Sequence, residues 1–224
     1  MRSVGILGGM GPEATILLMQ KVLGAVTAQD DADHLPLIVH QNPQVPSRIK
    51  ALLEGGGEDP GPVLAAMAQD LERAGAQALA MPCNTAHHYA DAVREASGLP
   101  FLDMLELTAA HLAALGAKRI GMLASPATRR VGVFDAIFAA HGLSPVWTGD
   151  EDEMLAIIRA VKAGEPMAPL GPRLRALADA MAGADHWLVA CTELSLMTGA
   201  LEGGPGWTDS LDCLVAGVAE FGFA

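Results

Sequence analysis

Two stretches of sequence decide the fold: AGAQALAMPCNT, residues 74–85, and AGADHWLVACTE, residues 182–193. Each begins with Ala-Gly-Ala, continues into a short apolar run of strand length, and reaches a cysteine seven residues after its second alanine. The cysteines are Cys83 and Cys191, and a small polar residue directly follows each one. This shared order predicts that both stretches are copies of one strand-and-turn unit.

The segments upstream of these stretches also match. Arg2–Leu7, RSVGIL, parallels Lys118–Leu123, KRIGML. The upstream segments lie 116 residues apart and the cysteines 108, so the copies differ by a small deletion. Two matches in the same order predict an internal duplication.

Strand and helix patterns alternate along the whole chain, which is typical of parallel sheets covered by helices. We expect strands at 4–7, 35–39, 78–81, 119–123, near 146 and at 187–190. We expect helices at about 12–28, 62–74, 85–96, 105–115, 128–141, 151–162, 171–181 and 210–221. The predicted fold class is α/β, with two similar lobes related by a pseudo-twofold axis, each a mostly parallel sheet flanked by helices. Residues 1–100 and 208–224 form the predicted first lobe with Cys83, and 101–207 form the second with Cys191.

The composition excludes several classes of protein. The 224 residues carry 14 Lys and Arg against 26 Asp and Glu, a formal net charge of −12. Nucleic acid and anionic lipid are poor partners for such a surface. No apolar run is long enough to cross a membrane, and glycines interrupt the N-terminal segment where a signal peptide would need an apolar core. The three cysteines are odd in number and widely spaced, which predicts reduced thiols, a cytoplasmic location and no structural metal site.

The two cysteines follow strand ends, where parallel sheets place their ligand clefts. The helix expected after each cysteine points its N-terminus at the thiol, and this predicts a lowered thiol pKa. If the lobes face each other, one thiolate can remove a proton from a carbon while the other thiol returns one to the opposite face. This is cofactor-independent racemisation of a small molecule, with Asn84, Thr85 and Thr192 as candidates to stabilise the developing charge. Cys213, in the terminal helix pattern, is predicted to belong to the core.

Three motifs resemble the aspartate/glutamate racemase family, in particular its aspartate racemase branch: GILGGMGPEAT (5–15), MPCNTAHHY (81–89) and CTELSLM (191–197). The resemblance covers essentially the whole chain. It implies a pyridoxal-phosphate-independent amino-acid racemase without a cofactor, built from two α/β domains and usually dimeric. It also implies that Cys83 and Cys191 are the paired acid and base.

Two cations match positions of that branch. Arg48 lies where aspartate racemases place a cation for the side-chain carboxylate of the substrate, and Lys162 lies at a second basic position. A guanidinium suits a carboxylate because it binds in a bidentate way, while a lysine adds a point charge. Met10 and Glu193, inside the first and third motifs, complete the candidate substrate-binding set. The resemblance therefore implies L- and D-aspartate, or a close acidic amino acid, as the substrate.

Several rival interpretations of the sequence stay open. Gly9–Ala14 matches a loose dinucleotide fingerprint, but the second expected strand ends without the carboxylate that would bind a ribose. His87 and His88 follow Cys83 and invite a Cys–His hydrolase, which would leave the second cysteine without a task. The chain could instead be a cofactor-independent decarboxylase or isomerase of the same superfamily, or a non-catalytic small-molecule binding protein.

Overall fold

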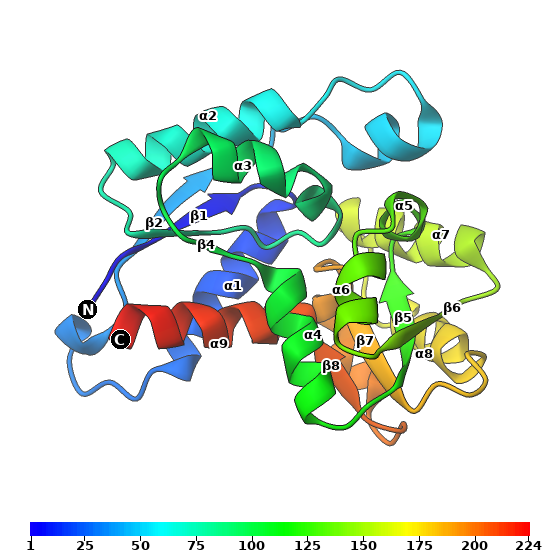
Figure 1. Cartoon of the computed structure of the whole chain (residues 1–224). Coiled ribbons are helices and arrows are strands. Elements are labelled where there is room, and N and C mark those ends of the chain that lie inside the picture. The colour runs from blue at the N-terminus through cyan, green and yellow to red at the C-terminus, as the bar shows by residue number, and fades with distance from the viewer.

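The computed structural model describes residues 1–224 and contains two parallel sheets of four strands each (Figure 1). The first sheet has the order β2-β1-β3-β4, and the second has the order β6-β5-β7-β8. The strands of the first are β1 (Val4–Gly8), β2 (Leu37–Gln41), β3 (Ala78–Ala80) and β4 (Phe101–Leu102). Those of the second are β5 (Arg119–Ala124), β6 (Ser144–Trp147), β7 (His186–Ala190) and β8 (Trp207–Asp209). The equal order confirms the expected fold of two similar α/β lobes.

The strand register matches the sequence duplication residue by residue. Val4 of β1 is paired with Ala78 of β3. Ile120 of β5, the counterpart of Val4, is paired with His186 of β7. Because Cys83 lies five residues after Ala78 and Cys191 five after His186, both cysteines leave their sheets at the same level.

Helices cover both faces of each sheet, as buried strands of a parallel sheet require. On the first sheet, α1 (Pro12–Ala25) and α9 (Ser210–Phe223) pack on one face, and α2 (Gly61–Arg73) and α3 (Ala90–Ala96) on the other. On the second, α4 (Met104–Ala114) and α6 (Asp135–Ala140) face α7 (Glu151–Lys162) and α8 (Leu170–Asp179) across the sheet. The remaining helical segments are α5 (Pro126–Val131), η1 (Asp31–Asp33), η2 (Lys50–Glu54), η3 (Thr85–Tyr89) and η4 (Leu194–Leu201). No helix is both long and apolar enough to span a bilayer.

Two long helices connect the lobes. α4 follows β4 of the first sheet but buries its apolar face on the second, while α9 follows β8 of the second sheet and packs on the first. The two helices pack against each other between the sheets (Figure 1). α9 returns the chain to its start, where the Arg2 amide donates to the Gly222 carbonyl at 2.8 Å. The division into lobes at residues 100 and 208 remains a prediction.

Several elements differ from the expected ones. The helix expected at 128–141 is two short helices, because Gly132 adopts a φ of +62° between them. The helix expected at 85–96 begins as the 3-10 turn η3 and becomes α3 only after Tyr89. The edge strands β4 and β8, of two and three residues, lie in segments where no strand was expected.

Candidate active site

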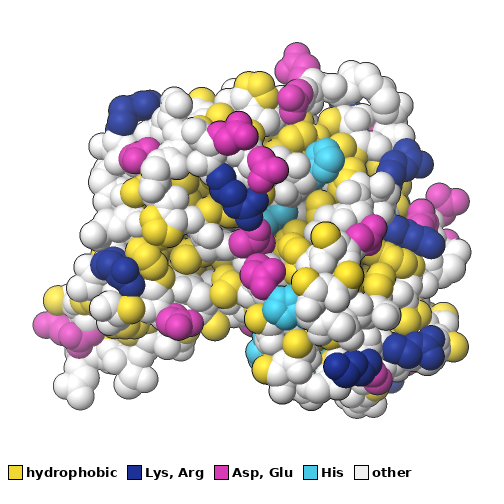
Figure 2. Space-filling view, viewed as in Figure 1, with side chains coloured by type: hydrophobic (Ala, Val, Ile, Leu, Met, Phe, Trp, Pro, Cys, Tyr) yellow, Lys and Arg dark blue, Asp and Glu magenta, His cyan; other side chains and the backbone are white.

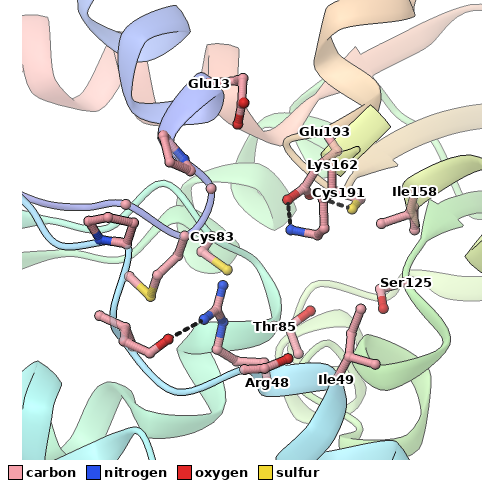
Figure 3. Close-up of a pocket in the computed structure, with 17 residues that line it drawn as sticks. Glu13, Arg48, Ile49, Cys83, Thr85, Ser125, Ile158, Lys162, Cys191 and Glu193 are labelled. Carbon is pink, nitrogen blue, oxygen red and sulfur yellow. Dashed lines mark hydrogen bonds and ion pairs between the residues drawn. The ribbon is translucent and has the colours of Figure 1, made fainter. Parts of the chain in front are cut away.

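One cavity of about 390 Å³ lies between the lobes and holds both repeated cysteines (Figure 3). Cys83 follows β3 in the first lobe, and Cys191 follows β7 in the second. Both side chains are largely buried, each with 7% of its surface exposed, and neither forms a disulfide. The remaining lining residues also come from both lobes: Gly9, Met10, Gly11, Pro12, Glu13, Pro43, Val45, Ser47, Arg48, Ile49, Thr85, Ser125, Ile158, Lys162 and Glu193.

Cys191 belongs to a polar chain of three side chains. Its thiol donates to Oε2 of Glu193 at 3.0 Å. The other carboxylate oxygen of Glu193 accepts from the Lys162 ammonium, which reaches it from the end of α7. Figure 3 shows the three side chains converging on one side of the cavity. The buried charge of Glu193 is thus compensated by a cation that borders the cavity.

These contacts set the protonation of Cys191. Burial raises the pKa of the Cys191 thiol well above its usual value, and the Glu193 carboxylate adds to the effect. The sequence prediction of a lowered thiol pKa is therefore wrong for Cys191, because desolvation and a neighbouring anion outweigh the N-terminus of the 3-10 helix η4. For Lys162, burial alone would lower the pKa, but Glu193 raises the net value. At neutral pH Cys191 is therefore a protonated thiol that lies beside the salt bridge of Lys162 and Glu193.

Arg48 reaches the cavity from the loop that follows β2. Its Nη1 donates to the carbonyls of Val45 at 3.3 Å and Pro46 at 3.0 Å. Its Nε is buried and has no hydrogen-bond partner, and no carboxylate of the chain is paired with it. Figure 3 shows the guanidinium directed into the cavity. Arg48 thus presents a cation with free hydrogen-bonding capacity beside Cys83.

A model of the Asp/Glu/Hydantoin racemase family matches residues 7–219. The chain belongs to this racemase family. Its structure resembles that of an aspartate racemase from Picrophilus torridus, with a TM-score of 0.90 and 27% identity, covering 100% of this chain and 95% of that one. The fold also resembles an aspartate racemase homologue from Pyrococcus horikoshii, with a TM-score of 0.76 and 21% identity over 100% of both chains. The broad specificity amino-acid racemase RacX of Bacillus subtilis is 24% identical over 228 residues, 94% of each chain.

Membership confirms the family that the three motifs resemble, and with it the prediction of an enzyme of the amino-acid racemase type. Within this racemase, the cavity brings together seven of the nine residues that the sequence singled out. The seven are Met10, Arg48, Cys83, Thr85, Lys162, Cys191 and Glu193.

Asn84 and Thr192, the other two, do not line the cavity of the racemase. Asn84 is buried, and its Nδ2 donates to Oγ of Ser210, which in turn donates to the carbonyl of Val189. It therefore links the Cys83 loop to the strand that precedes Cys191. Thr192 is buried with no partner for its hydroxyl. Neither side chain lines the cavity, and the substrate-binding role of each remains a prediction.

Thr85 both lines the cavity and joins the lobes of the racemase. Its hydroxyl lies 2.8 Å from the hydroxyl of Thr128 at the start of α5. This contact joins the turn after Cys83 to the second lobe. The turn therefore fixes the position of one lobe against the other as well as the position of the thiol.

Some residues that line the cavity of the racemase were not predicted from the sequence, among them Glu13 and Ser125. Glu13 fits the first turn of a helix, where an acid favours the helix dipole, but its carboxylate also borders the cavity. Ser125 follows β5 at the position that Gly9 holds after β1, so the duplication itself points to it.

Gly9 has a φ of +94°, and a Cβ there would lie 2.3 Å from the backbone of Asn42. The loose dinucleotide fingerprint is thus explained by close backbone packing.

Proposed function

We propose that this protein interconverts the L and D forms of aspartate or a close acidic amino acid, without pyridoxal phosphate, by proton transfer between Cys83 and Cys191. The observation that carries the proposal is the cavity between the lobes, which both cysteines line from opposite sheets at the same strand level. Proton removal and return on opposite faces of a carbon require two such groups.

Because Cys191 is protonated, it can act first as the general acid. As a protonated thiol it is ready to deliver a proton to a carbanion that Cys83 has generated. In the reverse direction it acts as the base, in the thiolate form that it takes once it has delivered its proton, while Cys83 returns the proton that it removed. Lys162 holds the carboxylate in place and balances its charge.

Aspartate carries two carboxylates, and Arg48 is the cavity cation available for one of them. Its free Nε and the absence of an internal carboxylate partner support this role. Lys162 is already paired with Glu193, and this observation favours a second candidate function, a racemase of broader amino-acid specificity. A chiral assay over acidic and neutral amino acids without added cofactor separates the two.

The compartment and the assembly complete the proposal. Free thiols are needed for proton transfer, so a reducing compartment such as the cytoplasm suits the enzyme.

We further propose a homodimer that buries the exposed apolar face of α1, where Ile16, Met19 and Leu23 are 57%, 42% and 56% exposed. The groove along this face contains no charged side chain except the titratable His34, so two copies with a net charge of −12 can meet there with little repulsion.

Variants of the two cysteines, assayed in deuterated water, test the mechanism. Cys83→Ser and Cys191→Ser should each reduce racemisation by roughly 10²–10⁴-fold, the usual contribution of a general acid or base. Each variant keeps one thiol, so each should still exchange the Cα proton of one enantiomer, and the two variants should exchange opposite enantiomers. Deuterium incorporation, followed by chiral chromatography and mass spectrometry, measures both effects.

Cys213→Ser is the matched control, because Cys213 lies in α9 away from the cavity and burial raises its pKa to about 11. Its racemisation rate should equal that of the unmodified protein. Full racemisation by either Cys83→Ser or Cys191→Ser would overturn the two-thiol mechanism. A protein that exchanges no Cα proton from any amino acid would overturn the proposed function.

A further inference from the structure

His87 is a buried histidine that the proposed proton transfers do not use. It lies in η3, four residues after Cys83, and only 1% of its side chain is exposed. Its Nδ1 is 2.8 Å from the backbone carbonyl of Cys83. Its Nε2 is 3.3 Å from the backbone amide of Met104. Both ring nitrogens therefore have backbone partners.

These partners determine the protonation of the ring. The Cys83 carbonyl can only accept a hydrogen bond, so Nδ1 must carry the proton. The Met104 amide can only donate, so Nε2 must be a free lone pair. Only the neutral ring protonated on Nδ1 makes both bonds. A doubly protonated ring would turn an N–H toward the Met104 N–H, and that bond would break.

Met104 is the first residue of α4, the helix that carries the chain into the second lobe. The side chain of Asp103 caps this helix by accepting from the amides of Leu105 and Glu106. It leaves the Met104 amide free, and His87 accepts from it. His87 therefore completes the N-cap of α4 and at the same time binds the carbonyl of Cys83.

The surroundings of His87 favour the neutral ring. Burial lowers its pKa, Arg94 acts in the same direction, and Asp103, 3.8 Å from Nε2, opposes them. The pKa remains below the ordinary value of 6.5. Figure 2 shows the groove between the lobes on this face, where acidic, basic and histidine side chains gather. The titratable or charged residues that line the adjoining cavity with His87 are His88, Asp91, Arg94, Asp103 and Glu106.

We propose that His87 is a positioning residue, which joins the carbonyl of Cys83 to the amide of Met104 and thereby fixes the Cys83 thiol relative to the second lobe. The inference rests on the proposed use of Cys83 as an acid and base. His87 itself exchanges no proton with the substrate. Its function requires the neutral ring, so the positioning is lost when the ring is protonated.

Two substitutions separate the two bonds. His87→Asn places an amide near the position of Nδ1 and can keep the bond to Cys83, but it does not reach Met104. His87→Phe keeps an apolar ring beside Phe101, whose centroid is 5.5 Å from that of His87, and loses both bonds. We expect kcat to fall roughly 10²-fold in His87→Phe and less in His87→Asn, with KM little changed, because small misplacements of a reacting group have effects of that size. His88→Asn, at an exposed neighbouring position, is the matched control and should retain the unmodified kcat.

The pH profile distinguishes positioning from a purely structural role. In the unmodified protein, kcat should fall as the pH drops through the His87 pKa, below 6.5, because protonation breaks the bond to Met104. His87→Asn has no group to protonate there, so its lower kcat should lose that acid limb. Alkylation by iodoacetamide, mapped by mass spectrometry, should change at Cys83 in both variants while the rate at Cys191 stays constant.

Variants that keep the unmodified kcat and acid limb, or that only melt at a lower temperature, overturn the inference. So does an equal change of alkylation at both cysteines. If the unmodified protein racemises and the His87 variants match it, only this inference fails. If the unmodified protein exchanges no Cα proton, the proposed function itself fails.

Discussion

At the scale of the residue, Arg48 and Lys162 show that two cations in one cavity need not be equivalent. Lys162 is neutralised by Glu193, whereas Arg48 contacts only backbone carbonyls and keeps an unpartnered Nε. A guanidinium in this state can form a charge-assisted bond with an incoming carboxylate. Under the proposed function, recognition of a dicarboxylic substrate would therefore depend on Arg48 more than on Lys162.

We expect Arg48→Ala to reduce kcat/KM for aspartate by roughly 10–100-fold, since a hydrogen bond to a charged group contributes about 1.5–3 kcal/mol. The loss for alanine, which has no side-chain carboxylate, should be much smaller. Steady-state assays with both amino acids measure the difference. Lys50→Ala, at an exposed cation that begins η2 two residues after Arg48 and does not line the cavity, should affect neither substrate. Equal losses on aspartate and alanine would remove the side-chain role of Arg48.

At the scale of the element, the junction between β8 and α9 contains a buried carboxylate. Asp209 caps α9 by accepting from the Leu211 amide, also accepts from Ser195, and has a side chain with no exposed surface. Burial raises its pKa to about 6, although the hydrogen bonds and Lys21 act in the opposite direction. An unfolded aspartate ionises near pH 3.9, so the unfolded chain releases this proton first.

The contribution of Asp209 to the stability of the folded protein therefore depends on pH. As the pH rises from about 4 to about 6, the contribution of Asp209 to stability should decrease, in total by about 2 kcal/mol. Asp209→Asn keeps the acceptor oxygen but cannot ionise, so its stability relative to the unmodified protein should increase over the same window. Urea denaturation at pH 4.5 and 7.5 measures the difference, with Asp150→Asn at the exposed cap of α7 as the control for replacing a capping carboxylate. A difference between Asp209→Asn and the unmodified protein that is the same at both pH values would contradict this expectation.

The elements that the sequence predicted well are those with long apolar patterns. β1 and α7 lie within a residue of their expected bounds, because a buried strand and an amphipathic helix leave strong periodicity. β4 and β8 were not predicted, because two or three residues are too few to show a hydrophobic periodicity. They become strands only by pairing with β3 and β7. The break at Gly132 was also hidden, since a single glycine inside a helical pattern does not reveal its φ.

The sequence predicted most of the residues that meet in the candidate site, but not the contacts that their side chains make. The repeated strand ends predicted one shared cleft for both cysteines on the condition that the two lobes face each other, and both cysteines line the cavity between the lobes. The raised pKa of Cys191 was not predictable, because it depends on burial and on the direction of the Glu193 side chain. The substrate role expected for Asn84 differs from its observed contact for a similar reason: its partner, Ser210, is 126 residues away in the sequence.

At the scale of the whole molecule, assembly has the clearest test. If two copies meet along α1, Ile16→Glu combined with Leu23→Glu should convert a dimer into a monomer, because it would bring four carboxylates into one apolar contact. Light scattering after size-exclusion chromatography measures the mass. Leu115→Glu, at a leucine that is 55% exposed outside this groove, should leave the mass unchanged. A double variant of unchanged dimeric mass, or an unmodified protein that is a monomer, would exclude this interface.

The unequal surroundings of the two thiols have a consequence for the catalytic cycle. Mirror-image amino acids have the same free energy in water, so no enzyme can favour one at equilibrium, however asymmetric its cavity. The Glu193–Lys162 pair is hydrogen-bonded to Cys191 and not to Cys83, so under the proposed mechanism it would bias the enzyme between turnovers rather than the reaction. In a two-thiol cycle, each conversion would leave the proton on the opposite cysteine, and the free enzyme would have to return to its resting form before it meets the same enantiomer again. Under the proposed mechanism, this resetting step is where the asymmetry between two otherwise similar lobes would become visible in the kinetics.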